Sequence, residues 1–267
     1  MKKVLNYKPS LDFKEPDANQ KILEKLYSYG KDISTRVFHR MRINLIYDEL
    51  VEIRNYNWFQ DSRSKTLDIG CNSGFLSKII FDLGMPNVLG IDLSDEYIEN
   101  ANLNFAQEGL LFRKEDATKL SFTNKFNLIL CTEVIEHTDN PKEVINAISR
   151  LLTDDGIAII SLPNFISLNY LITYFGKKIL RKQLSKDFIQ HIDYPFYKTL
   201  RLFEKEGFRI LKTRGVNLFL IDLILPYIYK RKNLLRLDAF LSKLYPFKYF
   251  SQFFFIVITK NNMGIKN

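Results

Sequence analysis

Between residues 65 and 162, short apolar segments alternate with segments whose apolar residues recur at helical spacing, and this alternation constrains the fold most strongly. The apolar segments predict strands at Lys65–Ile69, Asn87–Asp92, Leu110–Lys114, Phe126–Cys131 and Ile157–Leu162. The intervening segments predict helices at Phe75–Leu83, Asp95–Gln107 (with Ser94 as N-cap) and Pro141–Leu152. Strands separated by single helices predict an α/β protein with a doubly wound, mainly parallel sheet covered on both faces.

The rest of the chain extends this core. A helix is predicted at Pro195–Glu206, followed by strands at Phe208–Thr213 and Phe253–Lys260. The expected organisation is a tail and helical cap at 1–60, a cofactor-binding core at 61–162, an amphipathic insertion at 163–190, a core continuation at 191–214, a second helical insertion at 215–248, and a last strand with a tail at 249–267.

Composition limits the class of protein. Apolar residues make up 46% of the chain, which is typical of a globular protein. Since no apolar run reaches the roughly 20 residues of a membrane-spanning helix, and the N-terminus has no apolar secretory segment, we expect a cytoplasmic protein. The two cysteines, Cys71 and Cys131, predict neither a disulfide framework nor a zinc cluster.

The charge is distributed unevenly. Residues 161–267 carry 19 Lys and Arg against 6 Asp and Glu, whereas residues 1–160 carry 20 against 24. The basic second part indicates an anionic partner, for which a membrane surface, a phosphate-bearing substrate and nucleic acid are the alternatives. A solubilising lysine-rich surface would give the same composition.

A glycine loop follows the first predicted strand. The segment Leu67–Phe75 has the pattern D-x-G-x-x-x-G, in which Gly70 and Gly74 allow a tight turn and close approach of a ligand to the backbone. Asn72 also tolerates left-handed backbone. The spacing differs from the G-x-G-x-x-G of dinucleotide-binding proteins, which disfavours a dehydrogenase.

Two more acids follow the next strands. Asp92 ends the second strand, where its carboxylate can accept both hydroxyls of a ribose. Asp116 follows the third strand and can accept from an adenine amino group, with the Ala117 amide nearby. Because ligands of open α/β sheets bind at the carboxyl ends of the strands, these acids and the glycine loop predict a nucleoside site. Each acid alone would also suit a helix N-cap.

These motifs resemble those of class I S-adenosylmethionine methyltransferases: LDIGCNSG resembles their first motif, GIDLS the second and EDAT the third. The resemblance implies S-adenosylmethionine as cofactor and a seven-stranded sheet, six strands parallel and the last, Phe253–Lys260, antiparallel. In the family the first acid and the glycines face the methionine part, the second acid holds the ribose and the third contacts adenine. The implied contacts are Asp68, Gly70, Cys71, Asn72, Gly74, Asp92, Leu93, Asp116, Ala117, Thr132 and Glu133.

The acceptor side is expected just after the fourth strand. Glu133, Glu136 and His137 have helical spacing, so a shared helix face would form a candidate divalent-metal site. Alternatively, Glu136 and His137 simply begin a helix. His137 or His191 is expected to remove or orient the proton of the acceptor hydroxyl, and Glu133 to shape the pocket.

The E-V-I-E-H segment resembles two groups within the family. One contains the ubiquinone-biosynthesis O-methyltransferases and relatives that methylate glycan sugars. The other contains the small-RNA 3′-end 2′-O-methyltransferases, in which the matching residues, here Glu133, Glu136, His137 and His191, hold a metal. Tyr194 and Pro195 depart from the RNA enzymes' pattern, so the metal site stays open.

Both insertions combine apolar and basic residues. The first pairs Phe165, Leu168 and Leu171 with lysines and arginines, and the second, Leu218–Tyr229, is followed by Lys230-Arg231-Lys232. Such segments suit peripheral binding to an anionic membrane at the inner membrane face, or they pack together as a lid. The long aliphatic runs fit RNA binding less well.

The sequence therefore predicts an O-methyltransferase that acts on a membrane-associated hydroxyl acceptor, with a sugar of a lipid-linked or surface glycan as the first expectation. The alternatives are a quinone-precursor O-methyltransferase, an RNA 2′-O-methyltransferase with a metal, and a non-catalytic protein that binds S-adenosylmethionine and regulates a partner. The sequence gives no oligomeric state.

Overall fold

The computed structural model describes residues 33–164, 196–216 and 240–260, together with residues 167, 170–172, 175, 179, 218, 237 and 238. For residues 33–41 and 196 only the backbone is described. His191, Pro195 and most of the two predicted insertions therefore lie outside the described residues, as does the chain before residue 33.

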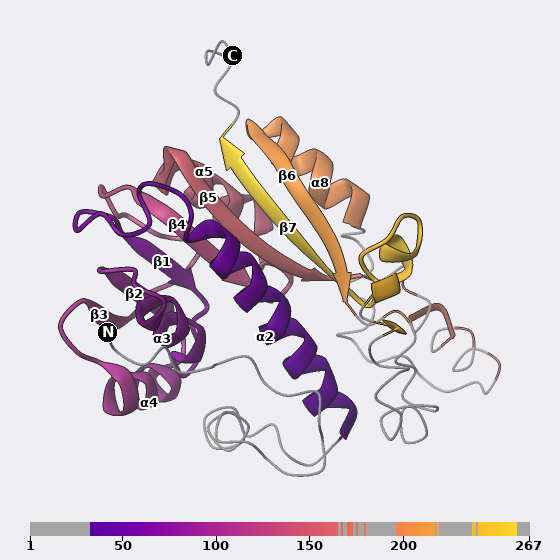
Figure 1. Ribbon diagram of the computed structural model, residues 1–267, viewed down its shortest axis with the longest axis horizontal. Helices are drawn as coiled ribbons and strands as arrows, with labels where there is room; N and C mark the ends of the chain where they lie inside the picture. The colour runs from indigo at the N-terminus through magenta and orange to yellow at the C-terminus, as the bar shows by residue number, and fades with distance from the viewer. Residues whose placement is uncertain are drawn as a thin grey trace.

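Seven strands form one sheet in the order β3-β2-β1-β4-β5-β7-β6 (Figure 1). The strands are β1 (Thr66–Ile69), β2 (Val88–Asp92), β3 (Leu110–Lys114), β4 (Phe126–Thr132), β5 (Leu152–Pro163), β6 (Phe208–Val216) and β7 (Phe253–Lys260). β7 lies between β5 and β6 and is antiparallel to both, while the other pairs are parallel. The predicted fold class, with six parallel strands and an antiparallel last strand, is confirmed.

Of the helices in the described residues, three cover one face of the sheet: α2 (Ile33–Ile53), α3 (Phe75–Asp82) and α4 (Asp95–Phe105). Ile46 and Leu50 of α2 are fully buried against this face, in a cluster that includes Phe255 and Val257 of β7. Figure 1 shows α2 crossing the sheet diagonally, so residues far ahead of β1 reach the carboxyl ends of the strands. The helical cap predicted before the first strand is present as α2.

The other face is covered by α5 (Pro141–Leu151) and α8 (Phe196–Lys205). Val144 and Ile148 of α5 and Phe203 of α8 are fully buried there, against the apolar side chains of β4, β5 and β7. Every strand between β2 and β7 is thus covered on both sides. This explains why β4 and β5 are nearly continuous apolar runs rather than alternating ones.

Most predicted elements agree with the structure to within two residues, and two strands are longer than predicted. β5 begins at Leu152, directly after α5, whereas we predicted Leu152 as the last helical residue and the strand only from Ile157. Leu152 already pairs with Phe126 of β4, and the register then shifts before Leu128, so the polar residues before Gly156 belong to an irregular strand start. β6 continues to Val216 because β7 pairs with it along that whole length.

Within the described part of the chain, no helix combines the length and the apolar character that crossing a bilayer requires.

Candidate functional site

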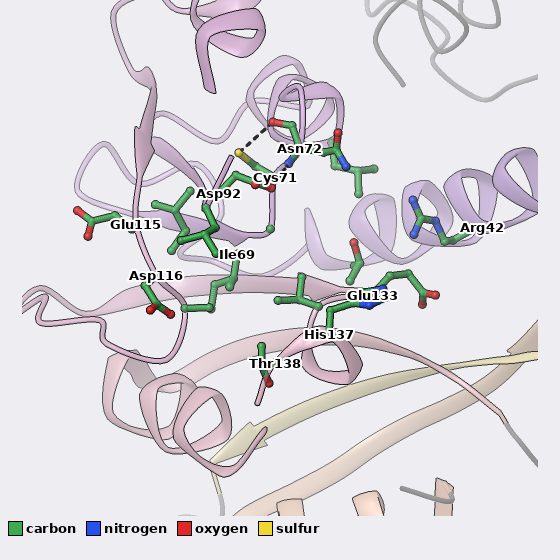
Figure 2. Close-up of a pocket in the computed structure, with 17 residues that line it drawn as sticks. Arg42, Ile69, Cys71, Asn72, Asp92, Glu115, Asp116, Glu133, His137 and Thr138 are labelled. Atoms are coloured by element: carbon green, nitrogen blue, oxygen red, sulfur yellow. Dashed lines mark hydrogen bonds between the residues drawn. The ribbon is translucent and has the colours of Figure 1, made fainter. Parts of the chain in front are cut away.

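A cavity of about 360 Å³ opens at the carboxyl ends of β1, β2 and β4, next to α2 (Figure 2). Small-molecule sites have volumes of roughly 300–1,000 Å³. Ten of the predicted residues line the cavity: Gly70, Cys71, Asn72, Asp92, Leu93, Asp116, Ala117, Thr132, Glu133 and His137. The predicted residues Asp68, Gly74 and Glu136 are not part of this wall. The structure thus gathers, in one place, side chains from four separate segments.

The glycine loop between β1 and α3 brings bare backbone to the cavity. Gly70 (φ 70°), Asn72 (φ 53°) and Gly74 (φ 84°) all have left-handed backbone. A Cβ atom on Gly70 would lie 2.2 Å from Cγ2 of Val134, so no side chain fits without displacing the β4 loop. The predicted reasons for glycine and asparagine at these positions agree with the observed backbone.

Asp92 is a carboxylate fixed in position by the backbone. The Asn72 N–H donates to Asp92 Oδ2 at 2.9 Å and the Ser94 N–H donates to Oδ1 at 3.0 Å. Each oxygen therefore keeps a lone pair for a ligand, and the carboxylate cannot rotate freely. Next to it Leu93 lines the cavity and is 66% exposed, so it offers apolar surface to a ligand.

Asp116 lies at the far end of the cavity, beside Glu115 (Figure 2). Its Oδ1 accepts from the Thr118 backbone N–H at 2.9 Å and from the Thr118 hydroxyl at 2.6 Å. These hydrogen bonds from Thr118, with Lys119 nearby, lower the pKa of Asp116. The acid is therefore an ionised acceptor that also shapes its own loop.

Asp68 lies one layer behind the loop. Its carboxyl group is buried, Oδ2 accepts from the Ser77 hydroxyl at 2.6 Å, and Oδ1 has no hydrogen-bond partner. Burial raises the pKa of Asp68 to about 7, with a further increase from the charge of Asp92. Ser77 is on α3, so Asp68 joins β1 to that helix, and its contact with a ligand stays a prediction.

The raised pKa of Asp68 predicts a specific pH dependence of stability. The unfolded chain ionises this carboxyl near 3.8, but the folded protein does so only near 7, so its contribution to stability is full below about pH 4 and is lost as pH rises through 7. We expect Asp68→Asn, which stays neutral, to gain stability relative to the wild type between pH 5 and pH 8.

Urea unfolding at the two pH values measures this change. The control is Asp95→Asn, since Asp95 is an exposed acid whose side chain pairs only with Lys114 among the ion pairs of the described residues. If the free energy of unfolding changed with pH by the same amount in the wild type and in Asp68→Asn, the raised pKa of Asp68 would be contradicted.

Glu133 has a strained backbone and a buried carboxyl. Its φ of 57° is left-handed, which a residue with a long side chain rarely adopts. Its Oε1 accepts from the Ser161 hydroxyl on β5 at 2.6 Å. Burial raises the pKa of Glu133, while Arg42 and Ser161 oppose the rise. Such strain is found at functional sites more often than elsewhere, where surrounding contacts maintain it.

The prediction that Glu133, Glu136 and His137 share one face of a helix is wrong. Only Ile135–His137 is helical, a single 3-10 turn (η1), and the left-handed Glu133 lies outside it. The Glu136 side chain is buried, its Oε2 lacks a hydrogen-bond partner, and burial raises its pKa well above the usual value. The His137 side chain is 67% exposed, with Nε2 4.0 Å from Glu136 Oε1.

A metal-binding arrangement is not seen among the described residues, where no group of three His, Cys, Asp or Glu side chains is placed to hold an ion. The fourth predicted ligand, His191, lies outside them. Cys71 and Cys131 are both buried and unbridged, and burial raises the pKa of each thiol.

Arg42 is a cavity residue that the sequence analysis did not predict. It is on α2, its side chain is buried, and it faces the cavity beside Glu133 (Figure 2). Its positive charge opposes the raised pKa values of Asp68, Glu133 and Glu136, so it is the cation shared by three buried acids. In the sequence, Arg42 stands out only as an arginine on the apolar side of a predicted helix. It is 26 residues from Asp68, and this separation does not predict that the two side chains lie near each other.

Residues 67–160 match the family model described as a methyltransferase domain. Over 132 residues the chain is 34% identical to a ubiquinone biosynthesis O-methyltransferase of Glaesserella parasuis, and over 130 residues it is 32% identical to the protein of that name from Haemophilus ducreyi. Each alignment covers 46% of this chain and 55% of the relative, so the chain spans about half the length of the curated relatives it matches.

Among solved structures, the chain resembles a magnesium protoporphyrin IX methyltransferase from Synechocystis, which was solved with bound S-adenosylhomocysteine. The TM-score is 0.60 at 16% identity, covering 92% of this chain and 95% of that one. This likeness concerns the fold. With the matched domain, it confirms the resemblance to class I S-adenosylmethionine-dependent methyltransferases that the three motifs predicted.

Proposed function

We propose that this chain, in which residues 67–160 form a methyltransferase domain, is an S-adenosylmethionine-dependent O-methyltransferase that acts on a hydroxyl group of a membrane-associated acceptor. The observation that carries the proposal is the Asp92 carboxylate, held by two loop amides at the end of β2 with a ligand-sized cavity in front of it. The names of the relatives support transfer to oxygen.

In the proposed binding mode, residues along the cavity wall contact successive parts of the cofactor. Asp92 accepts the two ribose hydroxyls, and the exposed Leu93 packs on the adenosine, which removes its apolar surface from water. Asp116 accepts the adenine amino group at one end. Arg42 binds the methionine carboxylate at the other end, beside Thr132 and Glu133. Gly70 lets the cofactor pass close to the loop.

The role of Arg42 leads to a selective prediction. Arg42→Met should weaken the binding of S-adenosylmethionine by about 10- to 100-fold, because a charge-assisted hydrogen bond contributes about 1.5–3 kcal/mol. Binding of methylthioadenosine, which has no carboxylate, should hardly change. Calorimetric titration of both ligands measures the two effects.

Arg63→Met is the matched control, since Arg63 is an exposed arginine paired with Asp61 outside the cavity. An equal loss of affinity for both ligands in Arg42→Met would show that Arg42 acts only by holding the buried acids in place.

The proposed acceptor class is a hydroxyl on an isoprenoid-bearing intermediate. This class contains the quinone precursors that the relatives' names indicate and the lipid-linked sugars expected from the sequence. The basic second part of the chain, at 19 Lys and Arg against 6 Asp and Glu, supports an acceptor at an anionic membrane surface.

S-adenosylmethionine, when bound, supplies an electrophilic methyl group. The protein must then place the acceptor oxygen in line with that group and take up the hydroxyl proton. His137 lines the cavity and its ring is exposed, so it can reach a proton on an acceptor that enters from outside. Glu133, held by Ser161, fills the inner wall and keeps the acceptor from lying deeper.

The experiment that tests the function incubates the full chain with methyl-labelled S-adenosylmethionine and either a membrane lipid extract or small RNA. Label should enter the lipid fraction, and release of the label into the aqueous phase by mild acid would identify a lipid-linked sugar rather than a quinone precursor. Label only in RNA, abolished by chelation and by His191→Ala, would replace the proposal with RNA methylation.

In the same assay we expect His137→Ala to lower the turnover of the lipid acceptor by about 100-fold, the usual effect of losing a general base, with unchanged binding of S-adenosylmethionine. Lys142→Ala is a control on the exposed surface of α5. Full turnover in His137→Ala would remove this residue from the mechanism. Cofactor binding with no transfer to any extract would favour the non-catalytic alternative.

A further inference from the structure

Six large apolar side chains are exposed within eleven residues ahead of β7. They are Phe240, Leu244, Tyr245, Phe247, Tyr249 and Phe250, and we refer to them as the aromatic platform. Tyr245 is 78% exposed and Phe240 59% exposed. The platform includes a 3-10 turn, η3 (Phe247–Phe250), drawn in gold near the tip of β6 in Figure 1. Exposed apolar patches of this density mark interaction surfaces.

The platform is anchored firmly to the sheet. The Asn164 side chain, at the end of β5, donates from Nδ2 to the Tyr249 carbonyl at 2.8 Å and to the Ser251 carbonyl at 2.7 Å. The Gly215 N–H donates to the Ser242 carbonyl at 3.0 Å. A Cβ atom on Gly215 would lie 2.7 Å from that carbonyl oxygen, so the segment packs directly on β6. The apolar side chains are therefore held outward by a fixed backbone.

The charged side chains of the platform segment have one sign. Lys243 is exposed, and Lys248 reaches over the Tyr249 ring and donates to the Thr213 hydroxyl at 2.8 Å. Residues 239–260 contain no Asp or Glu. The nearest acid before them, Asp238, is buried and accepts from the Leu218 N–H. Aromatic rings with lysines beside them are typical of proteins that bind the interface of an anionic bilayer.

The aromatic platform lies at the edge of the sheet where the cavity opens. Pro163, at the carboxyl end of β5, pairs with Phe253 just after the platform, and β5 lies next to β4, whose end carries Thr132 and Glu133 in the cavity wall. A bilayer docked on the platform would therefore lie at the edge of the sheet where the cavity opens.

We propose that the aromatic platform docks on an anionic phospholipid bilayer; this inference rests on the proposed function and names the surface that delivers its acceptor. A second copy of the chain is the other occupant to consider. In a symmetric contact the platform would face itself, which would bring Lys243 and Lys248 of both copies together with no acid to balance them. An anionic lipid surface provides the missing negative charge.

The test is flotation of the full chain with vesicles of phosphatidylcholine alone or of an equimolar mixture of phosphatidylcholine and phosphatidylglycerol. The wild type should bind the mixed vesicles and bind them less at high salt. Tyr245→Ser with Phe247→Ser should reduce partition at least about tenfold, and Lys243→Gln about fivefold on mixed vesicles only. Leu103→Ser with Leu111→Ser is the matched control, since both are exposed apolar residues on α4 and β3.

Two readouts separate this proposal from the proposed function. Every variant should retain the wild type's affinity for S-adenosylmethionine, because the platform residues are outside the cavity wall. A wild type that binds the cofactor but not mixed vesicles would overturn the docking surface alone. A second result would also overturn it: light scattering detects a concentration-dependent dimer, and the Tyr245 and Phe247 substitutions dissociate this dimer but leave vesicle binding unaltered.

Discussion

Asp92→Ala is expected to weaken the binding of S-adenosylmethionine by about 100-fold or more. Two charge-assisted hydrogen bonds to the ribose would be lost, each contributing about 1.5–3 kcal/mol. The Asn72 and Ser94 amides, which now donate to this carboxylate, would also lose their acceptor, so the glycine loop would lose its fixed position. Unlike Arg42→Met, Asp92→Ala should weaken the binding of methylthioadenosine as much as that of S-adenosylmethionine, because both ligands contain the ribose.

Calorimetric titration with both ligands measures the effect, and the matched control is Asp95→Ala. Asp95 is the next acid in the sequence, at the start of α4, where its exposed carboxylate pairs with Lys114 and does not line the cavity. If Asp92→Ala retained the wild type's affinity, Asp92 would have only the role of a loop cap, and the assignment of the ribose site would be wrong.

Gly70→Ala is expected to be the second severe change, lowering the free energy of unfolding by about 2–5 kcal/mol and abolishing cofactor binding. Left-handed backbone costs a residue with a Cβ atom about 1–2 kcal/mol. The added methyl would also overlap Val134 Cγ2 at 2.2 Å, and overpacking of this kind costs about 1–3 kcal/mol. Relief of that overlap would push the loop into the cavity or move the Glu133 segment.

Two comparisons separate strain from overlap. Gly207→Ala introduces the same left-handed strain at φ 82° with nothing within 4 Å of the new atom, so it should cost only about 1–2 kcal/mol. Combining Gly70→Ala with Val134→Ala removes the clashing atom and should recover part of the loss, measured against Val134→Ala alone. Equal costs for Gly70→Ala and Gly207→Ala in urea unfolding would mean that the loop has room to move.

Local sequence pattern predicted the fold well because the determinants are local. Ser94 caps α4 as expected, its hydroxyl accepting from the Tyr97 N–H at 3.3 Å, and β3 and β7 have the predicted bounds. The start of β5 was missed because polar residues and Gly156 resemble a turn. Only the pairing of Leu152 with β4, a contact between distant segments, makes this stretch a strand.

The cavity was predictable where one rule decides it, namely that parallel strands end at a common edge. That rule placed the glycine loop, Asp92 and Asp116 together. It gives no information on Arg42, which reaches the cavity because α2 crosses the sheet, or on Ser161, whose hydroxyl donates to Glu133 from the neighbouring strand β5. A different expectation failed at Glu133. Helical spacing predicted a helix face shared by Glu133, Glu136 and His137, but Glu133 has left-handed backbone and lies outside the short helix η1.

The acidic groups around Arg42 show why such a residue is needed here. Asp68, Glu133 and Glu136 are buried, and burial raises the pKa of all three. A buried cation among them lowers the free energy of their ionised forms and, in our proposal, leaves enough positive charge to bind a carboxylate of the ligand. The arrangement combines a structural role with a binding role, which is why the Arg42→Met test compares two ligands.

A crystal structure of the full chain with S-adenosylhomocysteine tests the central claim most directly. We predict that the ligand fills the cavity at the ends of β1, β2 and β4, with both ribose hydroxyls within hydrogen-bond distance of Asp92 and the homocysteine carboxylate next to Arg42. A ligand bound elsewhere, or bound in this cavity with its ribose away from Asp92, would contradict the account.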